Sequence, residues 1–199
     1  MGEEDGPMDK FSAILVFVIA TSFLLFFLGD LGITGQATSG TTISNVSISK
    51  YLAISFGANL SEGIQFGTVA TLPATNINAT HNNDSNTYSG GTTYTIDVST
   101  DSNTPVDFCI RANVGLTSLA ADVIGLGNET YEAYNITNST HPDLALETSM
   151  TTSYVKAFTG IVVGNSSYWR FWLDIPASQP SGTYNNTVSF EGVVTGLAC

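Results

Sequence analysis

The longest apolar run of the chain lies near its amino end, from Phe11 to Gly29, and contains neither a charged residue nor a proline. As an α-helix it would be about 28 Å long, close to the roughly 30 Å hydrocarbon core of a bilayer. The pattern therefore predicts a hydrophobic helix that contacts a membrane at least transiently. The large apolar side chains expected to face lipid are Phe11, Ile14, Leu15, Phe17, Leu24, Leu25, Phe26 and Phe27.

Three interpretations of residues 1–36 stay open. The length of the run and the four acidic residues before it favour a retained membrane anchor, because a secretory signal normally begins with basic residues. The small residues Gly35 and Ala37 favour a cleaved signal, because a signal peptidase cuts next to such residues. A pilin-type leader would also precede a hydrophobic helix, but the glycine that its peptidase needs is missing before Phe11.

Apolar and polar residues alternate from Gly40 to Phe56, which is typical of a strand with one buried face. The stretch is longer than the usual strand of about five or six residues. It therefore either bends to serve two sheets, or its first half pairs with something other than its own domain. The second interpretation makes residues 37–56 a linker and a donor strand, with Ile43, Val46 and Ile48 as its pairing side chains.

Further alternating stretches predict a β-domain over residues 57–199. The clearest is Ser167–Ile175, where Trp169, Phe171 and Leu173 share the core-facing row. A turn rich in proline and glycine separates it from the next alternating stretch. About eight or nine short strands with turns between them predict an all-β fold, an Ig-like β-sandwich preceded by the hydrophobic helix. The strands are expected at 63–69, 92–99, 106–112, 153–163, 167–175 and 183–194, with others nearby.

Three stretches depart from this alternation. Leu116 to Ile124 has apolar residues at helical spacing, so we expect a short helix there. Leu72–Gly91 and Gly125–Pro142 are rich in turn-forming residues and are expected to be long exposed loops, the second with an optional strand near Tyr131.

The chain has two cysteines, Cys109 and Cys199. Two is the number that forms one bridge in an oxidising compartment, and a cysteine as the last residue suggests that this end is tied down. We expect a disulfide between them, which is the alternative to two unrelated thiols.

Asn-X-Ser/Thr sequons occur nine times, against roughly four expected by chance for this composition. None precedes the apolar run, so the residues after it are expected outside the cell, with N-linked glycans as partners. An asparagine- and threonine-rich surface that forms sequons by accident is the alternative. The sites are Asn45, Asn59, Asn78, Asn83, Asn128, Asn135, Asn138, Asn165 and Asn185.

The net charge and the absence of known motifs reduce the number of function classes that we expect. The net charge of −12 repels phosphate, so we expect no nucleic-acid partner. We find no catalytic or metal motif, so we expect no enzyme, no metal and no cofactor. Weaker candidates are the loop histidines His81 and His141, a calcium site around Asp97, Asp101 and Asp107, and a carbohydrate platform or protein contact at Tyr168 and Trp172.

The closing stretch LDIPASQPSGTYNNTVSF, residues 173–190, resembles the last hairpin of secreted β-sandwich domains. These include subunits of archaeal surface pili and threads and of a bacterial biofilm matrix fibre. The resemblance covers the carboxyl third of the chain and the free-looking strand after the hydrophobic run. It implies donor-strand complementation, in which the amino-terminal strand of one subunit completes the sheet of the next.

Two functions follow as expectations. The first is a structural subunit of an extracellular filament, pilus or cell-surface coat that polymerises with copies of itself by β-strand addition. The second is a membrane-anchored surface glycoprotein or adhesin that does not polymerise. A carbohydrate- or calcium-binding module is a third and weaker option.

Overall fold

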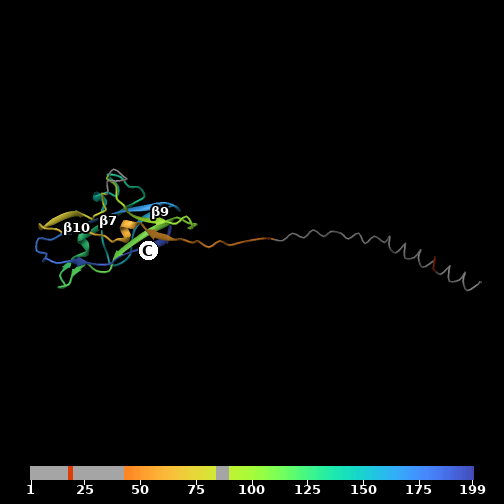
Figure 1. Ribbon diagram of the computed structural model, residues 1–199. Helices are drawn as coiled ribbons and strands as arrows, with labels where there is room; N and C mark the ends of the chain where they lie inside the picture. Colours follow the sequence, from red (N-terminus) through yellow and green to blue (C-terminus); the bar gives the residue numbers. More distant parts are fainter. Residues whose placement is uncertain (1–17, 20–42, 84–89) are drawn as a thin grey trace, which may run out of the picture. The chain divides into compact units, whose positions relative to one another are not determined.

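The computed structural model of the 199-residue chain describes residues 18–19, 43–83 and 90–199 (Figure 1). The chain divides into two units, Met1–Ser47 and Ile48–Cys199, and each is described by itself. Of the predicted membrane run, Val18 and Ile19 are described and are helical, and the eight lipid-facing residues proposed above lie outside the described residues. Among the described residues, no helix combines the length and the apolar character that a membrane span requires.

A six-stranded antiparallel sheet, called here the large sheet, forms around β10 of the second unit (Figure 1). Its strand order is β1-β3-β10-β7-β8, and β2 pairs with the end of β10 that β3 leaves uncovered. The strands are β1 (Ile54–Phe56), β2 (Ala74–Asn78), β3 (Tyr94–Val98), β7 (Glu129–Tyr134), β8 (Thr148–Ser149) and β10 (Ser166–Ile175).

Two three-stranded antiparallel sheets complete the unit. The sheet called here the β12 sheet has the order β12-β4-β9, and the small sheet has the order β11-β5-β6. The described residues thus form an all-β unit with almost no helix, which confirms the all-β part of the fold predicted from alternation. The elements are β4 (Val106–Ala112), β5 (Leu116–Ser118), β6 (Val123–Ile124), β9 (Val155–Ile161), β11 (Tyr184–Asn185), β12 (Val188–Val194), α2 (Ala58–Ser61), η1 (Leu126–Asn128) and η2 (Leu144–Leu146).

Aromatic side chains join the large sheet to the β12 sheet. Trp169 of β10 is fully buried, and its ring lies 5.1 Å from Phe190 of β12 and 6.3 Å from Phe108 of β4, both edge to face. Each such pair stabilises the fold by about 0.5–1.5 kcal/mol beyond the area it buries. The core-facing row predicted for residues 167–175 is therefore confirmed.

The predicted helix at Leu116–Ile124 is wrong, because β5 and β6 pair there as a hairpin. The hydroxyl of Ser118 accepts hydrogen bonds from the backbone N–H groups of Ala120 and Asp122, and this turn replaces the first helical turn. Local bonds of this kind are why serine competes with helix formation. Leu119, at the tip, is fully exposed instead of facing the core.

Three other expectations are corrected. Residues 63–69 form no strand, the expected loop from Leu72 contains β2, and the long stretch from Gly40 has strand structure within its described part at β1 alone. Gly63 and Gly67 have φ values of +99° and +70°. These left-handed conformations interrupt an extended chain, which explains why the alternation between them does not produce a strand.

The outward row of β10 is also covered. Arg170 is 5% exposed, and its guanidinium donates to the carbonyl oxygens of Asn82, Gly90, Asn138 and Pro142. A guanidinium can make five such bonds in a fixed planar fork. Arg170 therefore fastens two loops to the large sheet, and period-two alternation alone would have assigned it to solvent.

The carboxyl end is held to β4 by two interactions. A disulfide joins Cys109 to Cys199 across 90 residues, as the sequence predicted. Two residues earlier, Asp107 accepts hydrogen bonds from Lys156 Nζ at 2.9 Å and from the backbone N–H groups of Gly160 and Gly196. Burial raises the pKa of Asp107, but these hydrogen bonds outweigh it and lower the pKa to about 2.

Removing the disulfide tests how strongly this end is held. We expect the double substitution Cys109→Ser and Cys199→Ser to lower the free energy of unfolding by about 4 kcal/mol, because a 90-residue loop is released in the unfolded chain. Urea unfolding followed by tryptophan fluorescence measures this. Reduced wild-type protein is the control and should match the variant. A loss below about 1 kcal/mol would contradict a stabilising role for the bridge.

Candidate functional site

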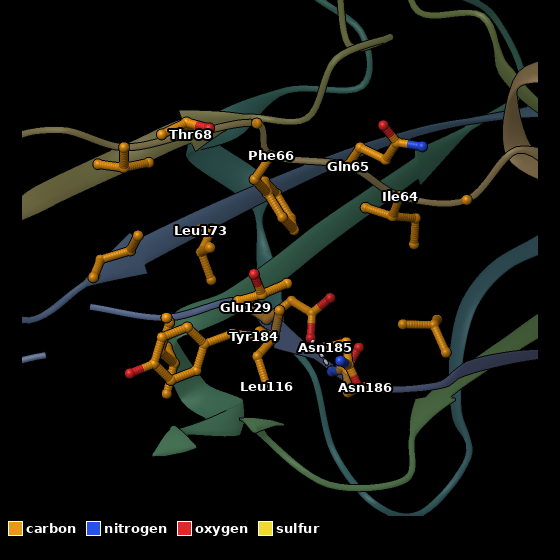
Figure 2. A pocket seen from close by; sticks show the side chains of 18 of the residues that line it. Ile64, Gln65, Phe66, Thr68, Leu116, Glu129, Leu173, Tyr184, Asn185 and Asn186 are labelled. Carbon is orange, nitrogen blue, oxygen red and sulfur yellow. Dashed lines mark hydrogen bonds between the residues drawn. The ribbon is translucent and has the colours of Figure 1, made fainter. Parts of the chain in front are cut away.

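A groove with a volume of about 960 Å³, lined by apolar side chains together with neutral amides and hydroxyls, opens beside β12 (Figure 2). Segment 63–70 lies along one side, and β11 and the start of β12 lie along the other. Leu173 of β10 and Glu129 of β7 lie between them (Figure 2). The apolar side chains that line it include Phe56, Leu60, Ile64, Phe66, Leu116, Ile124, Leu173, Ile175, Tyr184, Val188 and Phe190.

The groove exists because segment 63–70 approaches β12 without pairing with it. Its two left-handed glycines, Gly63 and Gly67, turn the chain on either side of Ile64 and Phe66. Phe66 consequently packs against the main core and against the smaller cluster of Leu116, Ile124 and Leu173. This wall therefore supplies apolar side chains without a strand's ladder of hydrogen-bonding groups.

β12 presents a free edge next to this groove. In the described residues β12 pairs with β4 alone, through a continuous register from Val188 opposite Ala112 to Val194 opposite Val106. Every second backbone N–H and C=O along its other edge has no strand to pair with, which makes the edge a template for another strand. Val188 and Phe190 of the same strand line the groove, so the edge and the apolar surface belong to one site.

Glu129 is the one charged residue among the described residues that line the groove. It is 1% exposed, and its Oε2 accepts a hydrogen bond of 2.6 Å from Asn186 Nδ2 (Figure 2). Burial raises the pKa of Glu129 from its ordinary value, and the Asn186 hydrogen bond opposes this shift only in part. The groove therefore holds one carboxyl group that is costly to bury, in a lining whose other polar side chains are neutral amides and hydroxyls.

Segment 43–48, the described part of the proposed donor strand, has no regular secondary structure. Ile43, Val46 and Ile48 are 90%, 84% and 80% exposed. From Ser49 onward the chain is fastened to the second unit, because Asn103 Nδ2 donates to the Ser49 carbonyl and Asn103 Oδ1 accepts from the Tyr51 N–H. An exposed apolar row thus precedes the point at which the chain is held.

All nine sequon asparagines lie among the described residues, and none is buried. Asn138 Oδ1 accepts hydrogen bonds from the backbone N–H and the hydroxyl of its own sequon threonine, Thr140. The exposed sites are Asn45, Asn78, Asn83, Asn135, Asn165 and Asn185, and the partly exposed sites are Asn59, Asn128 and Asn138.

The weaker candidates are held in structural contacts. His141 stacks on Tyr134 at 4.3 Å, and His81 meets Tyr94 edge to face at 5.4 Å. Trp172 is 3% exposed and donates to Asn78 Oδ1 of β2, so β2 covers this half of the surface considered for carbohydrate or protein contact, whereas Tyr168 is partly exposed.

The three aspartates considered for calcium have separate environments. Asp107 is paired with Lys156, and Asp97 Oδ1 accepts from Ser166. Nowhere in the described part of the chain do three or more histidine, cysteine or acidic side chains lie where they could hold a metal ion.

Sequence reasoning did not find the groove or Glu129. The groove is lined by side chains from seven strands, from α2 and from irregular segments such as 63–70 and 179–183. No local sequence pattern indicates that these residues meet. The position of Glu129 could have been inferred, because it lies on the same face of β7 as the buried residues Tyr131 and Ala133. An acidic residue in a core-facing row is unusual. The prediction of a loop over residues 125–142 gives Glu129 no such row, and its inward position is therefore not visible from that prediction.

Comparisons with known proteins give no relative: no family model, no curated protein and no solved structure matches this chain.

Replacing the buried carboxyl group tests its environment. Because the pKa of Glu129 is raised in the folded state, its contribution to stability is present at low pH and is lost as pH rises through that pKa. We expect Glu129→Gln to remove this loss and to be about 1 kcal/mol more stable than wild type at pH 7, with little difference at pH 4. Urea unfolding across this range measures the difference. Parallel curves for the two proteins would contradict the raised pKa.

Proposed function

We propose that the protein is a structural subunit of an extracellular filament, pilus or cell-surface coat, and that its copies join by β-strand addition. In this proposal segment 43–48 of one copy enters the apolar groove of the next and pairs with the free edge of β12. The observation on which it rests is that an apolar groove and an unpaired strand edge occur together, in a chain that also exposes an alternating apolar segment.

The chemistry of the two partners is complementary. An added strand would satisfy the backbone groups of the β12 edge, and its alternate side chains would fill the groove. Extended, the six residues of segment 43–48 span about 20 Å, and Val46 and Ile48 lie on one face about 7 Å apart. Each buried side chain of this size contributes about 1.5–3 kcal/mol when it leaves water. Free in water, the same strand edge and apolar row are aggregation hazards.

The fold and the location are part of the same proposal. The packing of the large sheet against the β12 sheet supports an Ig-like β-sandwich, in which the donor strand would extend the β12 sheet. The disulfide is compatible with an oxidising compartment, and the sequon positions are accessible to a glycosylating enzyme. The hydrophobic run would bring the chain to the membrane. We expect the subunit to act as a building material, without catalysis.

Two neighbouring substitutions in the full-length protein test the donor role. Ile48→Asp would place a carboxylate in the apolar groove, and a buried unpaired charge costs several kcal/mol, so we expect assembly to weaken by roughly 100-fold or more. Ser49→Asp is the matched control, because it adds the same charge on the opposite face and leaves every sequon intact. Electron microscopy of the cell surface and the fraction of protein in polymers measure assembly.

Unchanged assembly of the Ile48→Asp variant would contradict the donor role. If Ile48→Asp protein forms the same polymers as wild type, segment 43–48 is not the donor. Ile48 is 80% exposed in the structure, so the substitution should leave the thermal unfolding midpoint of the subunit unchanged. A lost polymer in an intact subunit therefore reports on assembly.

The alternative is a membrane-anchored surface glycoprotein that does not polymerise, which the length of the run from Phe11 to Gly29 favours. The intact mass of the native protein identifies how the amino end is processed. A mass that includes the run supports an anchor or a pilin-like helix, and a start near Thr38 supports secretion after cleavage. Polymers absent from the native surface would favour the alternative over the filament.

A further inference from the structure

Glu129 is the charged side chain of the groove, and one of its two carboxyl oxygens has a hydrogen-bond donor among the described residues. Its Oε2 is engaged by Asn186, whereas Oε1 accepts no hydrogen bond from any described residue. The side chain is 99% buried and lies among the groove residues (Figure 2). A carboxylate in this setting can accept a cation or a second hydrogen-bond donor that enters the groove. Tyr184 is the other titratable residue of the lining, and its hydroxyl donates to the Pro180 carbonyl instead.

A matching cation, Lys50, lies just after the donor segment 43–48, where Asn103 holds the chain to its own subunit through the Ser49 carbonyl and the Tyr51 N–H. Lys50 is the one lysine or arginine from position 37 to position 110. It shares the parity of Val46 and Ile48, so in an extended strand all three side chains point to the same face. Lys50 is exposed and forms no ion pair with any described residue. The polar residue that interrupts the apolar row of the donor therefore has the charge that the groove lacks.

We propose that Lys50 of one copy pairs with Glu129 of the next and fixes the register of the incoming strand. This inference rests on the proposed function. An apolar row at alternate positions excludes a slip of one residue, because that slip turns every side chain to the other face. It does not exclude a slip of two residues, which keeps the faces. A single charged pair does exclude it, because a strand slipped by two residues would place Ile48 at Glu129 and leave the carboxylate without its cation. A slip in the other direction would need Leu52, which packs against the core of its own subunit.

A double-mutant cycle in the full-length protein tests the pair. The variants are Lys50→Met, Glu129→Gln and the two together, and the readout is the protein concentration at half-maximal assembly. We expect Lys50→Met alone to raise this concentration by roughly 10- to 100-fold, because assembly then loses the attraction between the two charges. The double variant should assemble better than Lys50→Met alone. Arg111→Met, on the exposed side of β4, removes the same charge elsewhere and should have little effect.

Disulfide cross-linking measures the register of the added strand directly. Cysteines at Ile48 and Val188 would cross-link copies, and we expect one dominant cross-linked product in wild type but a mixture with neighbouring groove positions in Lys50→Met. Unchanged registers, or single variants whose effects simply multiply in the double variant, would overturn the pair. If Ile48→Asp blocks assembly while Lys50→Met and Glu129→Gln do not affect it, the pair is wrong and strand addition stands. If Ile48→Asp has no effect, strand addition itself fails.

Discussion

The packing of Trp169 between two sheets is the interaction on which the rest of the unit depends. Its ring is fully buried and contacts Phe108 and Phe190 of the β12 sheet and Phe171 and Tyr131 of the large sheet. The strand that holds it, β10, pairs with β2, β3 and β7 and therefore anchors the large sheet. With Trp169 in place, the position of β12 relative to β10 is fixed, and so is the distance across which the groove opens.

The groove forms because no strand of the described residues pairs with the outer edge of β12. A strand at 63–69 would have closed this side, but two left-handed glycines turn that segment into an irregular wall. Within the described residues, β12 is left with an edge that no strand pairs with and with exposed apolar side chains beside it, two features that isolated proteins normally cover. A third feature, the exposed apolar row at 43–48, belongs to the same chain. Strand addition between copies would resolve all three at once, which is why we favour it over a monomeric surface role.

Most of the strands could be predicted from the sequence, but little of the groove could. Period-two alternation located β3, β4, β9, β10 and β12, because each has one face against the core. It failed at Leu116–Ile124, where bonds from the Ser118 hydroxyl decide the local structure, and at Arg170, whose partners are carbonyl oxygens of distant loops. The presence of two cysteines was sufficient to predict the disulfide between Cys109 and Cys199. The groove could not be predicted, since its lining comes together only through tertiary packing, although the parity of Glu129 was a visible sign of a polar group facing inward.

Cross-linking between two different single-cysteine proteins tests the central claim most directly. Full-length Ile48→Cys and Val188→Cys are mixed before assembly and then oxidised, so a disulfide between the two introduced positions can form only between copies; the native cysteines are already paired with each other. Strand addition predicts a covalent heterodimer in the assembled material, with far less product when Ser49→Cys replaces Ile48→Cys. Assembled polymers in which neither pair cross-links would contradict the insertion of one copy's amino-terminal segment into the groove of the next.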